Sequence, residues 1–393
     1  MPQALHDIYL LVALALVALT APILAELLTL TLAAMTPSPR AEPSVLAALG
    51  RLIVLIPSHN EELNIARCVQ SIGDSAGSSQ DILVIAHNCN DATAANARAA
   101  GATVSELDDP SLAGKGNALA HGFDLAFNEM GADALVVIDA DSTVSTNLVP
   151  LIRQRLQSCF VLQCRYQCRS DANPKSRLRA LAFFCMNVVR PMGRNRLHLS
   201  CGIFGNGFAL RREILERVPY DAHSIVEDLE FHVALVSAGI SCDFVDDACV
   251  WAEVPAGSRG ATTQTARWEG GRIRMLRAHF LPLLIQVLRG RTSLLEPLLD
   301  LAGLPLAMEV LGLCLLLLVP IRGVRLYALC GFAILALHLL FAVFSGPDPA
   351  ADLRALAQVP AYLLSKLRML PAIFRMGRYR AAWTRTSRTE SPE

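Results

Sequence analysis

Residues 134–141, Ala-Leu-Val-Val-Ile-Asp-Ala-Asp, decide the fold, because an unbroken apolar run ends there in two carboxylates one residue apart. A short apolar run bounded by polar residues is typical of a strand buried on both faces of a sheet. Asp139 and Asp141 then lie at the carboxyl end of this strand, where open α/β sheets bind ligands. Paired carboxylates suit Mg2+ or Mn2+, although strand ends also carry Asp as a turn or capping residue. The stretch therefore predicts a metal site that needs support from its neighbours.

Short apolar runs alternate with helical patterns on both sides of this stretch. The period is that of βαβ units, so we expect an α/β domain with a mostly parallel sheet and helices on both faces. The expected strands cover residues 52–58, 82–86, 103–107, 134–138, 160–168, 204–210 and 242–250. No Gly-x-Gly-x-x-Gly follows the first strand, and the Gly-Lys-Gly-Asn of residues 114–117 lacks the rest of a P-loop. Both a dinucleotide fold and a P-loop fold are therefore disfavoured.

Polar clusters follow the first two expected strands. They are Ser-His-Asn-Glu at residues 58–61 and His-Asn-Cys-Asn-Asp at residues 87–91. Parallel strands bring their carboxyl ends to one edge of a sheet, so both clusters are expected near Asp139. Lys115 lies in a Gly-flanked turn before a helix, where its charge suits a diphosphate. An ordinary solvent-facing lysine is the alternative.

Two further groups of polar residues come later in the chain. Glu227 and Asp228 open an expected helix, where one carboxylate can act as a general base or both can simply complement the helix dipole. Gln264, Arg267 and Trp268 fall within about one helical turn, shortly before an apolar block. An aromatic belt at a membrane surface explains the tryptophan. It does not explain the amide and the guanidinium beside it.

The composition indicates a membrane protein. Of the 393 residues, 53% are hydrophobic, and the mean hydropathy is +0.40, values that a soluble enzyme rarely reaches. Apolar segments at residues 8–35, 294–320 and 326–344 are long enough to cross the roughly 30 Å hydrocarbon core, the last two as a helical hairpin. Residues 353–374 are apolar but interrupted by charges, a pattern that predicts a helix lying in the membrane interface.

Charge placement predicts the topology. The 35 basic and 35 acidic residues balance, so no overall field favours nucleic acid. Most Arg and Lys residues beside the apolar segments flank the central region, which places it in the cytoplasm, although Arg322 and Arg325 in the hairpin link oppose this orientation. We therefore expect an anchor (residues 1–36), a cytoplasmic domain (37–280) and a C-terminal membrane segment (281–393), located in the inner membrane of a bacterium.

Seven motifs follow one another along the chain. They are residues 56–62 (IPSHNEE), the loop at Asp91, residues 114–119 (GKGNAL), 139–141 (DAD), 205–207 (GNG), 226–228 (VED) and 264–268 (QTARW). In this order they resemble the membrane-bound family 2 glycosyltransferases, the group that includes cellulose, chitin and hyaluronan synthases. The resemblance spans residues 52–268, and the ordered set is far more specific than any single motif.

The resemblance implies a GT-A fold and a one-step, inverting transfer from a metal-bound nucleotide-diphosphate sugar. It implies that Asp228, beside Glu227, is the base, and that Asp139 and Asp141 hold Mg2+ or Mn2+. The implied donor contacts are Pro57, Asn60, Glu61, His87, Asp91, Lys115 and Asp139. The implied acceptor and pyrophosphate contacts are Gly205, Asn206, Gly207, Gln264, Arg267 and Trp268.

The chain departs from the family at His87, where relatives usually carry an Asp that contacts the base. A UDP-sugar is favoured and a GDP-sugar is the alternative. The leading interpretation of the product is a growing polysaccharide, because the motif at residues 264–268 is typical of processive members. Three spans are few for a channel, so export then requires a partner subunit or a homo-oligomer. The alternatives are a single addition to a lipid-linked or glycolipid acceptor and, less favoured, a noncatalytic regulator with the same fold.

Overall fold

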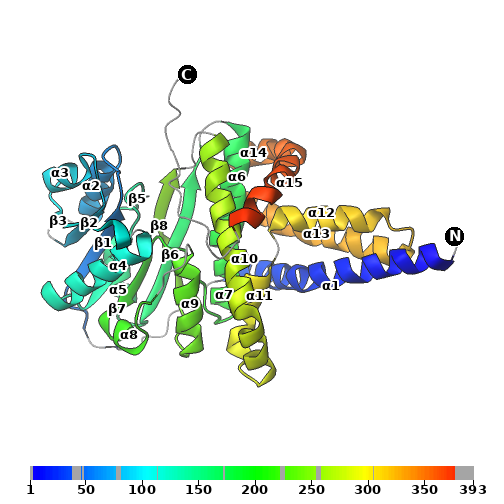
Figure 1. The fold of residues 1–393 in the computed structure, drawn as a ribbon, viewed down its shortest axis with the longest axis horizontal. Helices are drawn as coiled ribbons and strands as arrows, with labels where there is room; N and C mark the ends of the chain where they lie inside the picture. The colour runs from blue at the N-terminus through cyan, green and yellow to red at the C-terminus, as the bar shows by residue number, and fades with distance from the viewer. Residues whose placement is uncertain are drawn as a thin grey trace.

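The computed structural model of the protein describes residues 3–37, 46, 48–76, 81–112, 114–170, 173–221, 226–253, 258–303 and 305–376. Within these ranges it describes only the backbone of residues 3–6, 253, 258–265, 267 and 376. An α/β domain carries a bundle of three projecting helices (Figure 1), which are α1 (Gln3–Ala34), α12 (Leu306–Leu318) and α13 (Arg322–Ser345).

The α/β domain is built on an eight-stranded sheet with the order β3-β2-β1-β4-β7-β6-β8-β5. The strands are β1 (Leu52–Ser58), β2 (Ile82–His87), β3 (Thr103–Leu107), β4 (Ala134–Val137), β5 (Thr143–Val144), β6 (Val161–Arg169), β7 (Phe208–Arg211) and β8 (Asp243–Glu253). Strands β3, β2, β1 and β4 are parallel. Strand β7 is antiparallel to β4 and β6, and β8 is parallel to β6 but antiparallel to β5. The predicted α/β class is confirmed, with a mixed second half of the sheet.

Helices cover both faces of this sheet, as expected. In β1, Ile53 and Leu55 pack on one face and Val54 and Ile56 on the other, because successive side chains of a strand alternate. The first face is covered by α4 (Lys115–Asp124), α6 (Pro174–Phe184), α7 (Arg190–Arg196), α8 (Arg212–Arg217) and α9 (Glu227–Ser237). The second is covered by α2 (Ile65–Ala76), α3 (Thr93–Ala99) and α5 (Leu148–Arg155).

The helical bundle is attached to the core of the domain. Ala34 at the end of α1 and Ala342 and Val343 near the end of α13 are buried in the same apolar cluster as the first face of the sheet. Burial of apolar surface is the main favourable term in folding. The helices and the sheet are therefore joined by shared core packing.

Two described helices are long and apolar enough to cross a membrane, namely residues 7–34 of α1 and all of α13. The segment at residues 294–320 was expected as the first arm of a helical hairpin, and with its bent helix pair counted as one span the described residues contain up to three spans. It is divided into α11 (Leu295–Ala302) and α12, and the helix pair is bent by 77°. Gly303 and Pro305 have extended backbones at the break, and a proline disfavours helical conformation in the residue before it.

Three other helices connect the sheet to the bundle. They are α10 (Ser258–Leu288), α14 (Pro349–Ala355) and α15 (Val359–Met376). Lys366 of α15 is paired with Glu269 of α10, and Arg177 of α6 lies 2.8 Å from Asp352 of α14. In Figure 1, α10 stands between the sheet and the bundle. The interfacial position expected for residues 353–374 stays a prediction.

Candidate active site

The two carboxylates of residues 139–141 lie directly after β4, at the edge of the sheet where the parallel strands end. The backbone N–H of Asp139 donates to Oδ1 of Asn206, and Nδ2 of Asn206 donates to Oγ of Ser142. Asn206 is completely buried. It therefore braces the carboxylate loop from beneath, a position different from the acceptor contact that the resemblance implies.

Lys115 begins α4 and points at this edge. Its Nζ donates to Oδ1 of Asp139 at 2.5 Å and to the carbonyl of Gly205 at 2.6 Å. Burial alone lowers the pKa of Lys115, but the carboxylates of Asp139, Glu227 and Asp228 outweigh it and raise the pKa. The amine is therefore a cation held in place between the carboxylates that follow β4 and the pair on α9.

The turn at residues 205–207 requires glycine at both ends. Gly205 and Gly207 have φ values of +71° and +77°, which side chains with a Cβ rarely adopt. A Cβ on Gly205 would lie 3.2 Å from Oδ2 of Asp228 and 3.4 Å from Nζ of Lys115. A Cβ on Gly207 would lie 2.9 Å from Val250. The same positive φ values are incompatible with a strand at residues 204–207, so β7 begins only at Phe208, four residues later than expected.

The loops after β1 and β2 are tied to each other by hydrogen bonds. Oδ1 of Asn60 accepts from the N–H of Asn90, and the N–H of Glu61 donates to the hydroxyl of Thr93. Oδ1 of Asp91 accepts from the N–H of Thr93. Asn60 and Asp91 therefore hold the loop conformations, whereas Pro57 and Glu61 reach the cavity wall.

His87 ends β2 and is almost fully buried. Its Nε2 lies 3.1 Å from Nδ2 of Asn88, and its carbonyl lies 2.8 Å from Nδ1 of His59. Burial is the main cause that lowers the pKa of His87, and the neighbouring His59 adds to it. A neutral imidazole with one acceptor nitrogen therefore stands where the family resemblance implies a carboxylate.

Glu227 and Asp228 open α9 on the opposite side of Lys115. Oδ1 of Asp228 accepts from the N–H of Leu229 at 2.9 Å. Burial raises the pKa of both carboxyls, and for Glu227 the adjacent Asp228 raises it further. A carboxylate with a raised pKa is a stronger base, so burial makes both carboxylates better proton acceptors than exposed ones.

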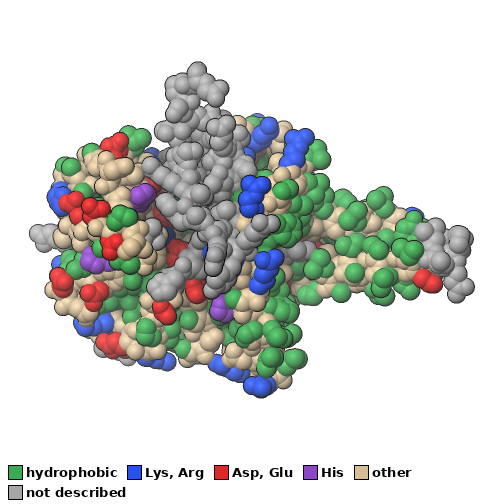
Figure 2. Space-filling view, viewed as in Figure 1, with side chains coloured by type: hydrophobic (Ala, Val, Ile, Leu, Met, Phe, Trp, Pro, Cys, Tyr) green, Lys and Arg blue, Asp and Glu red, His purple; other side chains and the backbone are tan. Residues whose placement is uncertain are grey.

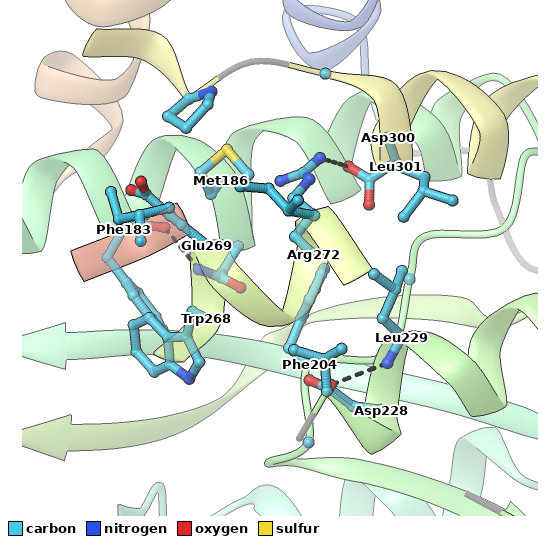
Figure 3. A pocket seen from close by; sticks show the side chains of 18 of the residues that line it. Phe183, Met186, Phe204, Asp228, Leu229, Trp268, Glu269, Arg272, Asp300 and Leu301 are labelled. Atoms are coloured by element: carbon cyan, nitrogen blue, oxygen red, sulfur yellow. Dashed lines mark hydrogen bonds and ion pairs between the residues drawn. The ribbon is translucent and has the colours of Figure 1, made fainter. Parts of the chain in front are cut away.

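A cavity of about 1230 Å³ joins these groups. The predicted site residues on its wall are Pro57, Glu61, His87, Lys115, Asp139, Asp141, Gly205, Glu227, Asp228 and Trp268. Its described wall does not include Asn60, Asp91, Asn206 or Gly207. The side chains of Gln264 and Arg267 lie outside the described residues, although α10 contains both positions. Trp268 is 39% exposed, and its ring lies beside that of Phe183, with centroids 6.2 Å apart (Figure 3).

Sequence reasoning missed a buried ionic cluster behind this cavity. Three arginines of α7 and α10 meet three carboxylates of α1 and α11: the cluster consists of Arg190, Arg194, Arg272, Glu26, Glu296 and Asp300. Asp300 lies 3.1 Å from Arg190, 2.9 Å from Arg194 and 3.5 Å from Arg272. Figure 3 shows Arg272 between Asp300 and the side of the cavity that holds Asp228. Carboxylates within apolar segments were the sequence signal for this cluster. The arginines that pair with them are distant in sequence, so the signal did not identify the partners.

Comparison with known proteins agrees with this geometry. The sequence profile described as "Glycosyl transferase family group 2" matches residues 134–345, more than half of the chain. "Probable glycosyltransferase YdaM" of Bacillus subtilis (strain 168) is 25% identical over 242 residues, which are 57% of this chain and 55% of that protein. The chain thus spans about half the length of this curated relative.

A solved structure has a similar fold. The mannosyltransferase PcManGT from Pyrobaculum calidifontis, in complex with GDP-Man and Mn2+, aligns with a TM-score of 0.54 and 16% identity. The alignment covers 93% of this chain and 96% of that one. At this identity the likeness concerns the fold, which extends over the sheet and the helices alike. The profile match decides the family, and the chain belongs to glycosyl transferase family group 2.

Proposed function

We propose that the protein is an inverting, metal-dependent glycosyltransferase that moves a sugar from a nucleotide-diphosphate sugar onto an acceptor hydroxyl at the membrane. The observation that carries the proposal is the meeting of Lys115, Asp139 and Asp228 at one point of the cavity. Lys115 contacts Asp139 directly, and Gly205 lies against both Lys115 and Asp228. The proposed diphosphate-binding cation, metal-binding carboxylate and base therefore lie next to one another on the cavity wall.

Asp228 is the proposed general base. It takes the proton of the acceptor hydroxyl while that oxygen attacks the anomeric carbon of the donor. The new carbon–oxygen bond forms on the face opposite the bond to the diphosphate. That older bond breaks in the same step, and the diphosphate leaves with its electron pair. A single displacement inverts the anomeric configuration. Burial supports this role, because it raises the pKa of Asp228 and so strengthens the carboxylate as a base.

Lys115 is the proposed contact of the departing diphosphate. Its ammonium group is preorganised by Asp139 and by the carbonyl of Gly205. Fixed charges of this kind stabilise a developing negative charge without reorganisation during the reaction. Arg267 is proposed to act at the same end of the donor, and Trp268 to contact the acceptor beside Phe183.

Asp139 and Asp141 fit Mg2+ or Mn2+. Both carboxylates line the cavity, and these ions are commonly held by one or two carboxylates together with substrate phosphates and water. Among the described residues, no group of three or more His, Cys, Asp or Glu could hold a metal unaided. When bound, the ion would supply positive charge to the diphosphate. The Mn2+ and GDP-Man in the PcManGT complex support this proposal and keep both GDP- and UDP-sugars as candidate donors.

The membrane location is also part of the proposal. We infer that α1, α13 and the α11–α12 pair anchor the protein in a bacterial inner membrane, with the α/β domain in the cytoplasm. The two long apolar helices support this placement, as does the concentration of hydrophobic side chains along the bundle in Figure 2. The limits proposed for anchor, catalytic domain and membrane segment are residues 1–36, 37–280 and 281–393.

Substitution of the base tests the proposed function. Membranes containing wild-type protein, Asp228→Asn or the surface control Asp124→Asn are incubated with Mn2+ and radiolabelled UDP- and GDP-sugars. We expect Asp228→Asn to lower sugar transfer by at least about 10²-fold, with nucleotide binding retained and the control unchanged. Equal transfer by wild type and Asp228→Asn would remove the base assignment. Absence of transfer by the wild type with every donor would favour a noncatalytic regulator.

A further inference from the structure

The cavity that contains the proposed chemistry does not end at the α/β domain. Its wall also includes Arg272 and residues of α1, α12 and α15. The apolar residues on this extension are Leu16 and Leu19 of α1, Met308, Leu311 and Leu315 of α12, and Leu367, Leu370 and Phe374 of α15. We call these eight residues and the space between them the apolar arm.

Among the described residues the apolar arm offers few free hydrogen-bonding groups, since Lys366, next to Leu367 on the wall, is paired with Glu269. Thr20 is on its wall, but its hydroxyl donates to the carbonyl of Leu16 and also lies 2.7 Å from the hydroxyl of Tyr327. A hydroxyl taken from water into such a space loses hydrogen bonds that the wall does not replace. The arm is therefore unsuited to a hydrated glycan and suited to a hydrocarbon chain.

The apolar arm is continuous with the outer surface of the bundle. Leu19 of α1 is 49% exposed and Leu315 of α12 is 53% exposed, although both also line the cavity. Hydrophobic side chains cover this bundle in Figure 2. In a membrane this surface faces lipid. One end of the cavity therefore lies at the proposed catalytic groups, and the other end opens to the hydrocarbon core of the membrane.

We propose that the acceptor is a lipid whose hydrocarbon chain lies in the apolar arm while its hydroxyl-bearing head group reaches Asp228. This inference rests on the proposed function and names its acceptor. It replaces the growing polysaccharide as the favoured product, because the apolar wall matches a hydrocarbon chain and leaves the hydroxyls of a glycan without partners. Polar groups such as Glu269 and Arg272, at the junction between arm and site, lie where the head group passes.

Two matched pairs of substitutions test the proposal. Leu315→Trp and Leu19→Trp place a large ring inside the apolar arm. Leu318→Trp and Leu14→Trp place the same ring on exposed positions of the same helices, 74% and 58% exposed, that are not on the described cavity wall. The two members of each pair share the same substitution and the same helix, and they lie within about one and a half turns of each other. They therefore differ mainly in access to the arm.

Each variant is reconstituted in vesicles made from a total bacterial lipid extract. UDP-glucose, UDP-N-acetylglucosamine and GDP-mannose are first compared for binding to the wild type with Mn2+, and the tightest donor is then used in radiolabelled form. Product is separated into organic-phase label and water-soluble label, and donor binding is measured for every variant. Donor binding reports on the folded donor site independently of the acceptor.

We expect wild-type label in the organic phase as a product with a single added sugar. We expect the two arm variants to lower this transfer by at least about tenfold with donor binding nearly unchanged, since a displaced acceptor reacts slowly, and the two control variants to match the wild type. A ladder of water-soluble products, or equal transfer by arm and control variants, would overturn the lipid proposal and leave the proposed function intact. Failure of the wild type to bind any donor would overturn both.

Discussion

The two halves of the cavity are built in opposite ways, and we call them the donor half and the acceptor half after the ligands proposed for them. The donor half is formed by strand ends and short loops whose polar groups bond one another, as Lys115 does with Asp139 and Asn206 does with the carboxylate loop. The acceptor half is formed by long helices with apolar walls. Charged side chains near the second half include the buried ionic cluster and the paired Lys366 and Glu269. The contrast indicates that the donor half positions a polar ligand by directed bonds, whereas the other half admits an apolar ligand by shape and hydrophobicity.

Breaking the ionic cluster is expected to have the largest effect on stability. Arg194 is 2% exposed and is paired with Glu26, Glu296 and Asp300. We expect Arg194→Met to lower the free energy of unfolding by about 3–5 kcal/mol, because carboxylates then stay buried without a partner. Denaturant unfolding of the detergent-solubilised protein measures this effect.

The control for the cluster is an exposed ion pair of the donor half. Arg98 lies 2.6 Å from Glu106 on the surface, and Arg98→Met is expected to cost at most about 1 kcal/mol. Similar losses in the two variants would show that the cluster does not join the helices to the domain more strongly than a surface pair does.

A Cβ at Gly205 is expected to damage the donor half specifically. Gly205→Ala combines a positive φ with contacts to Asp228 and Lys115. We expect a loss of roughly 10- to 100-fold in transfer rate, which corresponds to about 1–3 kcal/mol of local strain. Initial rates with a saturating donor provide the measurement.

Gly73→Ala serves as the comparison for Gly205. It lies in α2 with no atom within 4 Å of an added Cβ, so its transfer rate should equal that of the wild type. An unimpaired Gly205→Ala would mean that the turn at residues 205–207 does not set the spacing of the site.

The smallest expected effect is a shift in the pH dependence of transfer when Glu227 is replaced. Asp228 must be ionised to act, and burial raises its pKa, so activity should fall as the pH decreases through this raised pKa. Asp228 raises the pKa of the adjacent Glu227, and repulsion between two neighbouring carboxylates acts on both of them. Glu227→Gln is therefore expected to move the acidic limb of the rate profile to lower pH, by less than about one pH unit.

Rate profiles from pH 5 to 9 test this shift, with the surface variant Glu216→Gln as control; the range brackets a carboxyl displaced upward from about 4. A limb that stays in place, or moves to higher pH in Glu227→Gln, would contradict the coupling between the two carboxylates.

The donor half was largely predictable from the sequence, because its signals are local. The apolar run before Asp139 marks a buried strand, and parallel strand ends bring Lys115 to it. The direction of β7 was not predictable, since an apolar run does not state which way it pairs. Nor was the bracing role of Asn206, which depends on contacts with residues more than sixty positions away.

The acceptor half was less predictable, because it depends on contacts between residues that are distant in sequence. Hydropathy located the apolar segments, but the bend at Gly303 and Pro305 breaks one of them, and a proline signal was present there. The partners of Asp300 come from α7 and α10, and no pattern within an apolar segment indicates them. Helix packing, not local sequence, determines which apolar residues form the arm.

Metal-dependent nucleotide binding at Asp139 tests the central claim most directly. Calorimetric titration of UDP and GDP into the detergent-solubilised protein, with and without Mn2+, is compared among wild type, Asp139→Asn and the exposed control Asp74→Asn. We predict that wild type and control bind one of the nucleotides tightly only with Mn2+, and that Asp139→Asn weakens this binding at least about 100-fold, or ~2.7 kcal/mol. Equal affinity with and without Mn2+, or in Asp139→Asn and the wild type, would contradict a metal-bound donor at the end of β4.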